Sequence, residues 1–250
     1  EAPVPVIATK TPSDCFFAAI EAARIAIEYM TPVLLLSDGY IANGAEPWKF
    51  PKAAEIEEIK VSFAKGEKNE EGNWKDYLPY KRDEKLVRPW AIPGTAGLEH
   101  RIGGLEKEID TGNVSYDPEN HEKMTKLRAE KVAKIADSIP AQHIDQGPEK
   151  GKLLILGWGS TYGSIKGSVK ELNEEGYDIA HAHLRYLNPF PKNLGAILAN
   201  YETVLIPELN DGQLVTVIRD KFLIDAKRYN KIKGLPIYKD ELKAEILKHL

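Results

Sequence analysis

The sequence of 250 residues has a single cysteine, Cys15, and lacks any long apolar run. One thiol cannot form an internal disulfide, and it cannot ligate an iron–sulfur cluster alone. No apolar stretch approaches the roughly 20 residues that a membrane-spanning helix needs, and the first residues, EAPVPVIATK, carry neither a basic leader nor a signal-peptide core. We therefore expect a soluble, cytoplasmic protein that makes no membrane contact.

The sequence also lacks a basic tract, and its formal net charge is −4. A mildly acidic surface disfavours nucleic acid as a partner. Hydrophobic residues make up 42% of the chain and charged residues 29%, which is globular composition, and the length suits one large or two ordinary domains.

What the sequence does contain is a βαβ pattern in Gly151–Leu187. An apolar run, Leu153–Leu156, leads to a turn with glycines at 157, 159 and 163. Apolar residues at helical spacing follow, and then a strand-like run, Ile179–Leu184. Such a unit joins parallel strands by a right-handed crossover, so residues 151–250 are expected to form an α/β domain.

The rest of this domain repeats the alternation of strand and helix. A third apolar strand is expected at Thr203–Ile206, and the turn after it, Glu208–Leu214, leads into another helix. A last helix is expected at Lys239–Leu250, with Asp240 as its cap.

The first 45 residues predict two strands around one helix. Thr11 offers an N-cap hydroxyl and Pro12 takes the first helical position, ahead of an apolar face that runs to Met30. The run Val33–Leu36 is typical of a buried parallel strand. Two strands and one helix cannot cover both faces of a parallel sheet, so we expect residues 1–45 to be the end of an incomplete domain.

Residues 46–150 lose the regular alternation and are rich in Gly, Pro and Trp. Long irregular regions of this kind are usually functional or belong to an interface. Ile56–Ala64 alternates partly and is expected to form one arm of a hairpin. A helix is expected from Asp117 to about Ala136, and the Pro/Gly-containing segment after it marks a domain boundary near residue 150.

Two glycine-rich segments resemble phosphate-binding motifs, but each departs from the required spacing. Gly157–Gly163 reads GxGxxxG rather than GxGxxG, and no acidic residue ends the second strand, so we do not expect a dinucleotide site. Gly147–Lys152 has three residues between its glycines where a phosphate loop needs four, and Leu153 replaces the Ser or Thr that would hold magnesium.

The histidines suggest no metal site. His181 and His183 share one face of a strand, but no third ligand follows at a usable spacing. His100 and His121 lie beside acidic residues in the irregular region, where an acid–base role is conceivable and a structural role is favoured. We assign no catalytic residue and no metal ligand.

Five stretches together resemble the alpha subunits of 2-oxoacid:ferredoxin oxidoreductases, most closely the 2-oxoglutarate type. They are TPSDCFFAAIEAARIAIEYMTPVLLLSDGYIANGAEPW (11–48), RPWAIPGTAGLEHRIGGLEKEIDTGNVSYDPENH (88–121), GWGSTYGSI (157–165), LNPFPKNL (187–194) and PELNDGQL (207–214). They run in family order and span nearly the whole chain.

The resemblance implies an enzyme that contains thiamine diphosphate with magnesium, and an iron–sulfur cluster in the full complex. It would oxidatively decarboxylate a 2-oxoacid to acyl-CoA and reduce ferredoxin, with a beta subunit as partner. Residues 1–45 would be the last βαβ part of the pyrimidine-binding domain and 46–150 a connecting region. Residues 151–250 would be a Rossmann-like transketolase C-terminal domain. The glutamate that activates thiamine would lie outside this chain, so the chain alone is expected to bind none of these cofactors and to be inactive.

Three alternatives stay open. In the first, the chain is a stand-alone subunit-interaction module. In the second, the substrate of the enzyme is pyruvate or a branched-chain 2-oxoacid. In the third, the C-terminal domain binds an anion such as coenzyme A. Open α/β sheets usually bind ligands at the carboxyl ends of their strands. The residues that would bind such an anion follow two expected strands and are Gly159, Ser160, Thr161, Asn210, Gly212 and Gln213.

Overall fold

The computed structural model describes residues 2–250, which divide into two compact units. One unit comprises the residues before Val6, Ile20–Leu34 and Phe50–Ser138; the other comprises Val6–Ala19, Leu35–Lys49 and Ile139–Leu250. Each unit is described by itself below.

The second unit is built on a four-stranded parallel sheet in the order β4-β3-β6-β7. Its strands are β3 (Gly151–Trp158), β4 (Ile179–Leu184), β6 (Tyr201–Glu208) and β7 (Lys227–Asn230). The register pairs Leu154 with Ala180 of β4 and with Val204 of β6. The expected βαβ unit and third strand are confirmed, and β6 is longer at both ends than its apolar run.

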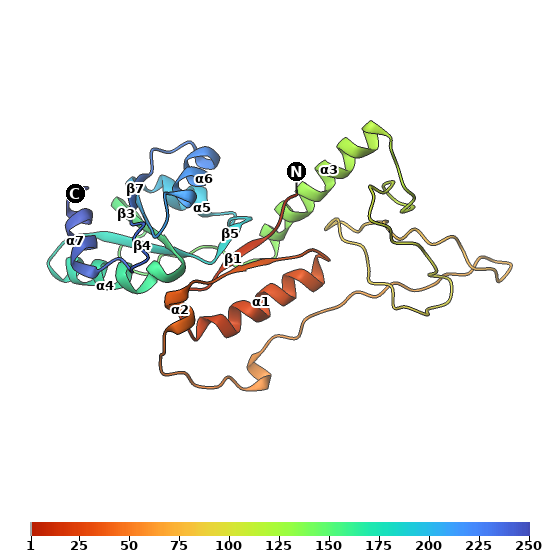
Figure 1. Cartoon of the computed structure of the whole chain (residues 1–250), viewed down its shortest axis with the longest axis horizontal. Coiled ribbons are helices and arrows are strands. Elements are labelled where there is room, and N and C mark those ends of the chain that lie inside the picture. Colours follow the sequence, from red (N-terminus) through yellow and green to blue (C-terminus); the bar gives the residue numbers. More distant parts are fainter. Residues whose placement is uncertain (1) are drawn as a thin grey trace. The chain divides into compact units, whose positions relative to one another are not determined.

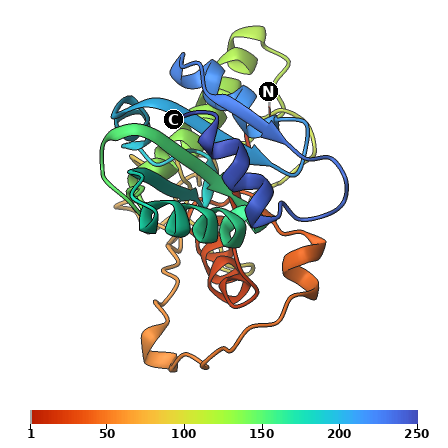
Figure 2. The same cartoon turned by 90° about the vertical axis from the view of Figure 1, so that its left-hand side faces the viewer.

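Helices cover both faces of this sheet because the side chains of β3 alternate between two apolar clusters. Leu153 and Ile155 pack with helices α4 (Tyr162–Glu174) and α7 (Lys239–Leu247). The neighbouring leucines of β3 pack with α5 (Leu194–Ala199) and α6 (Gln213–Phe222) on the opposite face. Figure 1 shows the two helix pairs on either side of the sheet, and Figure 2 shows α4 beside α7. The result is a three-layer α/β/α arrangement, and the α/β class that the sequence predicts is confirmed.

A second sheet has the order β2-β1-β5, with β1 (Val6–Ala8), β2 (Leu34–Leu36) and β5 (Tyr186–Asn188). Strands β1 and β5 are antiparallel. The Thr9 N–H donates to the Leu36 carbonyl at 3.0 Å. Leu34 and Leu35 are 53% and 37% exposed, so the expectation of a buried strand at this position is wrong. Its place at the edge of the sheet leaves β2 uncovered.

Helix α1 (Asp14–Glu28) begins at Asp14 rather than at Pro12, but the Thr11 hydroxyl accepts a hydrogen bond at its start, as the sequence predicts. The Asp14 N–H donates to the Thr11 hydroxyl at 3.3 Å, and the Lys10 N–H donates to the Asp14 carboxylate at 3.0 Å. The Thr11 hydroxyl thus satisfies one of the backbone donors that a helix start leaves free. A short helix, α2 (Gly39–Asn43), follows β2, with Asp38 as its N-cap.

The segment from Gly44 to Tyr116 is irregular, as expected. Its described residues contain a single 3₁₀ turn, η1 (Ala53–Glu55), and isolated bridges such as Phe63 with Trp90. The Phe63 bridge is parallel, so the expected hairpin arm at Ile56–Ala64 is wrong. This part of the chain pairs with a distant segment rather than with its sequence neighbour.

Helix α3 (Pro118–Lys134) is capped by Asp117, whose carboxylate accepts the Glu119 N–H at 3.1 Å, and a 3₁₀ turn, η2 (Ile135–Asp137), ends it. Polar contacts tie this unit together over long sequence separations. The Tyr29 hydroxyl donates to Ser138 Oγ at 2.8 Å, and the Lys131 ammonium donates to the Met30 carbonyl at 3.2 Å.

Helix α7 differs from expectation at its start. Its N-cap is Tyr238, whose N–H donates to the Glu241 carboxylate at 2.6 Å, so the assignment of Asp240 as cap is wrong. Within residues 2–250, no helix has both the length and the apolar character to cross a bilayer.

Candidate functional site

The candidate site lies at the carboxyl ends of β3 and β6, where the direction of winding of the sheet reverses. Strand β4 lies on one side of β3 and β6 on the other, so the turns that follow β3 and β6 leave the sheet at a topological switch point. Trp158 Nε1 at the end of β3 donates to Glu208 Oε1 at the end of β6, at 3.2 Å. The structure thus brings the two predicted groups to one edge: Gly159, Ser160 and Thr161 with Asn210, Gly212 and Gln213.

At the end of β6, Glu208 accepts hydrogen bonds with its side chain from the turn and helix that follow. Its side chain is fully buried, and its carboxylate accepts the N–H groups of Leu214 and Val215 in the first turn of α6, at 2.9 and 3.0 Å. It also accepts the Asn210 amide at 3.1 Å. A carboxylate at this position complements the positive end of the helix dipole.

Asn210 pairs with the remaining donors of the turn. Its Oδ1 accepts the N–H groups of Gly212 and Gln213, at 2.8 and 3.0 Å. Gly212 has φ +84°, and a Cβ there would lie 2.9 Å from Val215 Cγ1, so glycine is required. The first N–H groups of α6 are therefore paired with acceptors of this chain itself.

On the β3 side, the 3₁₀ turn η3 (Gly159–Thr161) contains the predicted serine and threonine. The Ser160 hydroxyl donates to the Asp38 carboxylate, and the Thr161 hydroxyl donates to the Trp158 carbonyl at 2.7 Å. The other oxygen of Asp38 accepts the Ile41 N–H at 3.0 Å. A negative side chain thus lies against the turn proposed for an anion.

Asp38 and Glu208 were missed as site residues from the sequence. Each follows an apolar strand and precedes a turn and a helix, at Ser37-Asp38-Gly39 and at Glu208-Leu209-Asn210. An acidic residue at the end of an apolar run and before a helix was the available signal for both.

His181 and His183 lie behind this edge and form a buried pair. His183 Nε2 lies 3.0 Å from the Gly159 carbonyl, and since a carbonyl only accepts, this nitrogen carries the proton. His183 Nδ1 then accepts from His181 Nε2 at 3.4 Å. Burial lowers the pKa of His181 to about 3 and holds that of His183 well below its usual range. Both imidazoles are neutral at pH 7, and no cluster of three metal-ligating side chains is found among the described residues.

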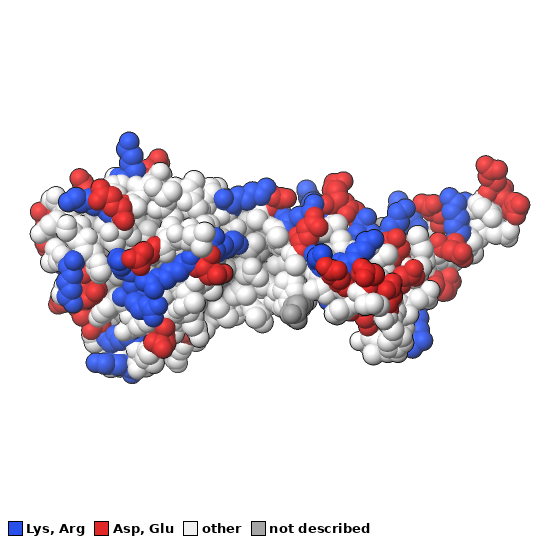
Figure 3. Space-filling view, turned by 90° about the horizontal axis from the view of Figure 1, so that it is seen from above, with Lys and Arg blue, Asp and Glu red and all other residues white. Residues whose placement is uncertain are grey.

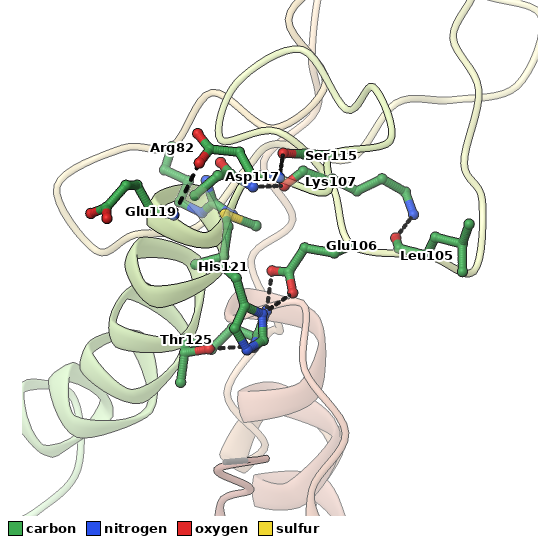
Figure 4. Close-up of polar contacts among 12 residues, drawn as sticks. Arg82, Leu105, Glu106, Lys107, Ser115, Asp117, Glu119, His121 and Thr125 are labelled. Carbon is green, nitrogen blue, oxygen red and sulfur yellow. Dashed lines mark hydrogen bonds and ion pairs between the residues drawn. The ribbon is translucent and has the colours of Figure 1, made fainter.

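His100 and His121 lie in the other unit and in different surroundings. His121 Nδ1 lies 2.6 Å from a Glu106 oxygen, and Figure 4 shows Glu106 reaching from its loop to the imidazole on α3. The His121 contact lowers the pKa of Glu106, and Arg128 adds to this effect. His100 Nδ1 lies 2.7 Å from the Leu98 carbonyl. The structure gives both histidines contacts that hold loops in place.

The surface charge of both units is mixed. On the face shown in Figure 3, lysines and arginines lie beside aspartates and glutamates over each unit. Ion pairs such as Lys243 with Glu175, at 2.7 Å, account for part of this pattern.

Two family models match the chain. Residues 1–117 match the thiamine diphosphate-binding domain of pyruvate flavodoxin/ferredoxin oxidoreductases, and residues 151–237 match core domain II of pyruvate:ferredoxin oxidoreductases.

Among curated proteins, subunit KorA of 2-oxoglutarate oxidoreductase from Mycobacterium tuberculosis is 49% identical over 97% of this chain and 36% of its own length. The alpha subunit of 2-oxoacid:ferredoxin oxidoreductase from Saccharolobus solfataricus is 30% identical over 98% of this chain and 39% of its own length. The chain thus spans little more than a third of these relatives.

A solved structure of 2-oxoglutarate:ferredoxin oxidoreductase from Magnetococcus marinus, with 2-oxoglutarate, coenzyme A and succinyl-CoA bound, superimposes with a TM-score of 0.87. It is 27% identical and covers 99% of this chain and 42% of its own. Both matched family models, the relatives and the fold agree with the resemblance of the five sequence stretches. The chain belongs to the alpha subunits of the 2-oxoacid:ferredoxin oxidoreductase family.

Proposed function

We propose that this chain is part of the alpha subunit of a thiamine-diphosphate-dependent 2-oxoglutarate:ferredoxin oxidoreductase. The reaction is oxidative decarboxylation of 2-oxoglutarate to succinyl-CoA with reduction of ferredoxin. The observation that carries the proposal is the 49% identity to a 2-oxoglutarate oxidoreductase subunit over 97% of this chain. The single cysteine, with no disulfide to form, supports a cytoplasmic location.

The single cysteine and the described residues offer no complete ligand set for an iron–sulfur cluster or a metal ion. Cys15 is the only thiol, so a cluster ligated by several cysteines requires another polypeptide segment. The described residues hold no group of three side chains suited to a metal ion. We therefore propose that a beta subunit and further parts of the assembly supply the cluster and the magnesium, and we derive no catalytic step from this chain.

A partner surface is supported by the exposed apolar side chains of the irregular region. Seven large apolar residues there are at least 47% exposed: Phe50, Phe63, Trp74, Ile92, Ile102, Leu105 and Tyr116. Exposed apolar side chains at this density are typical of protein interfaces. We propose that residues 50–116 contact the beta subunit.

The testing experiment measures turnover by the full-length chain co-expressed with its beta subunit. The assay contains 2-oxoglutarate, coenzyme A and a viologen dye as electron acceptor, with pyruvate and 2-oxoisovalerate in parallel. We expect preferential turnover of 2-oxoglutarate that disappears when thiamine diphosphate is removed. Equal or faster turnover of another 2-oxoacid would correct the substrate. Absence of thiamine-dependent turnover of all three would favour the alternative, a subunit-interaction module without catalytic function.

Coenzyme A is also a candidate ligand of Gly159–Thr161. Because Glu208 and Asn210 already pair with the first N–H groups of α6, a phosphate contact by Gln213 would use its side chain. Calorimetric titration with coenzyme A tests this site, and no heat at millimolar ligand would count against it.

A further inference from the structure

A cavity of about 450 Å³ in the first unit is lined by residues of the irregular region and of helix α3. Five cations line it: Arg82, Arg88, Lys107, Arg128 and Lys131. Glu106 is the lining carboxylate. The cavity is several times larger than one water molecule and falls in the size range of sites for small-molecule ligands.

The cations lie close to one another. The guanidinium carbon of Arg88 is 4.8 Å from the centre of the Tyr80 ring, and that of Arg82 is 5.8 Å from it. The positive charges of Arg88 and Arg128 act on Arg82, and those of Arg82 and Arg88 act on Lys131. Positively charged side chains from three segments, residues 82–88, residue 107 and residues 128–131, therefore line one cavity.

Little negative charge balances them. Glu106 is shared between Arg128, at 3.2 Å, and His121, at 2.6 Å. The other four cations bind backbone carbonyls instead: Arg82 donates to Ile109 at 2.7 Å, Arg88 to Pro79 at 3.3 Å, Lys107 to Gly103 at 2.5 Å and Lys131 to Met30 at 3.2 Å. Within residues 2–250, none of these four has a carboxylate oxygen within 4.0 Å of its charged nitrogen atoms.

Unbalanced and partly buried charges of one sign are costly unless an anion pairs with them. We propose that this cavity binds a small molecule that carries two or more phosphate groups. Tetrahedral phosphate groups offer oxygens in several directions, which suits cations that approach from three segments, and guanidinium groups bind phosphate with two hydrogen bonds. The apolar side chains of Leu86, Leu105 and Met124 also line the cavity and would contact an uncharged part of the ligand.

The state of Lys131 gives the site a measurable signature. Burial lowers the pKa of Lys131 to about 8, and the neighbouring arginines act in the same direction. A bound anion would raise this pKa, so at pH 8 binding would take up about half a proton. The charged groups that line the cavity together with Lys131 are Arg82, Arg88, Lys107, Arg128 and Glu106, and Asp110 acts on Arg82.

The test is calorimetric titration of pyrophosphate into the full-length chain with its co-purified subunits, saturated with thiamine diphosphate so that the cofactor's own site is filled. Arg88→Gln and Lys131→Met each remove one cation and are expected to weaken binding about tenfold. Lys123→Gln removes the same charge from an exposed position on α3 and is the matched control. Arg88→Lys, which keeps the charge, separates loss of binding from loss of folding.

We expect pyrophosphate to bind, and to bind more weakly at high salt. We also expect binding at pH 8 to take up protons, which is measured by comparing the binding heat in buffers of different ionisation enthalpy. Citrate serves as the multivalent carboxylate for comparison. The proposal is overturned by three results: no binding at millimolar pyrophosphate, equal weakening by Lys123→Gln, or citrate binding as tight as pyrophosphate. Binding to the isolated chain but not to the assembly would also overturn it, because a partner protein would then fill the cavity. These outcomes do not depend on 2-oxoacid turnover.

Discussion

Substitution of Glu208 by glutamine tests the role of the one buried carboxylate at the edge of the sheet. The carboxylate accepts four hydrogen bonds, three at Oε1 and one at Oε2. If the amide oxygen replaces Oε1, the amide nitrogen faces the Val215 N–H, donor against donor. An unsatisfied buried donor costs about 1–3 kcal/mol. Loss of the negative charge at the start of α6 adds about 0.3–2 kcal/mol. We expect a decrease of about 2–4 kcal/mol in the free energy of unfolding.

The assay is urea unfolding followed by circular dichroism at pH 7. Glu202→Gln is the matched control, because Glu202 is exposed on the same strand and its substitution should change stability by less than about 0.5 kcal/mol. A Glu208→Gln protein as stable as the Glu202→Gln protein would refute the reasoning, because it would mean that the start of α6 does not depend on this charge.

Three further predictions concern the same unit. Gly157→Ala should lower the free energy of unfolding in urea by about 1–3 kcal/mol, because the new Cβ would lie 2.4 Å from Ile165 Cδ1. Gly163→Ala, which has open space around it, should instead stabilise α4 slightly. Because His181 has a folded pKa of about 3 against an ordinary 6.5, the unfolded state binds more protons below pH 6.5. His181 by itself is therefore expected to lower stability by about 2 kcal/mol between pH 7 and pH 5, and a His181→Gln protein should lose less over this range. Ser160→Ala should leave α2 in place. If η3 contacts a phosphate of coenzyme A, this substitution should weaken coenzyme A binding about tenfold in calorimetry. An unchanged affinity would show that η3 is not part of the binding site.

The sequence alone determined the α/β class and most of the helices. Apolar patterning is a local property, so the apolar run Leu153–Leu156 and the helical face of α4 were visible without a structure. Helix starts are local as well, which is why the start of α3 at Asp117 and the role of the Thr11 hydroxyl at the start of α1 were predicted. Asp240 was assigned wrongly because the helix starts one residue before it, at Lys239, with the Glu241 carboxylate accepting the Tyr238 N–H, and a Tyr at the N-cap gives no such signal.

Only the tertiary structure decided which distant residues meet. Edge position exposes β2, although its sequence reads as a buried strand, because exposure depends on which neighbours a strand has. The Ser160 hydroxyl donates a hydrogen bond to Asp38, which is 122 positions away in the sequence, and no local sequence pattern predicts that contact. The cations at 82, 88 and 131 come from an irregular loop and a charged helix that each resemble ordinary solvated surface. The sequence determines the charge and the local structure of each residue. Only the folding of distant segments against one another determines which side chains lie close enough to interact.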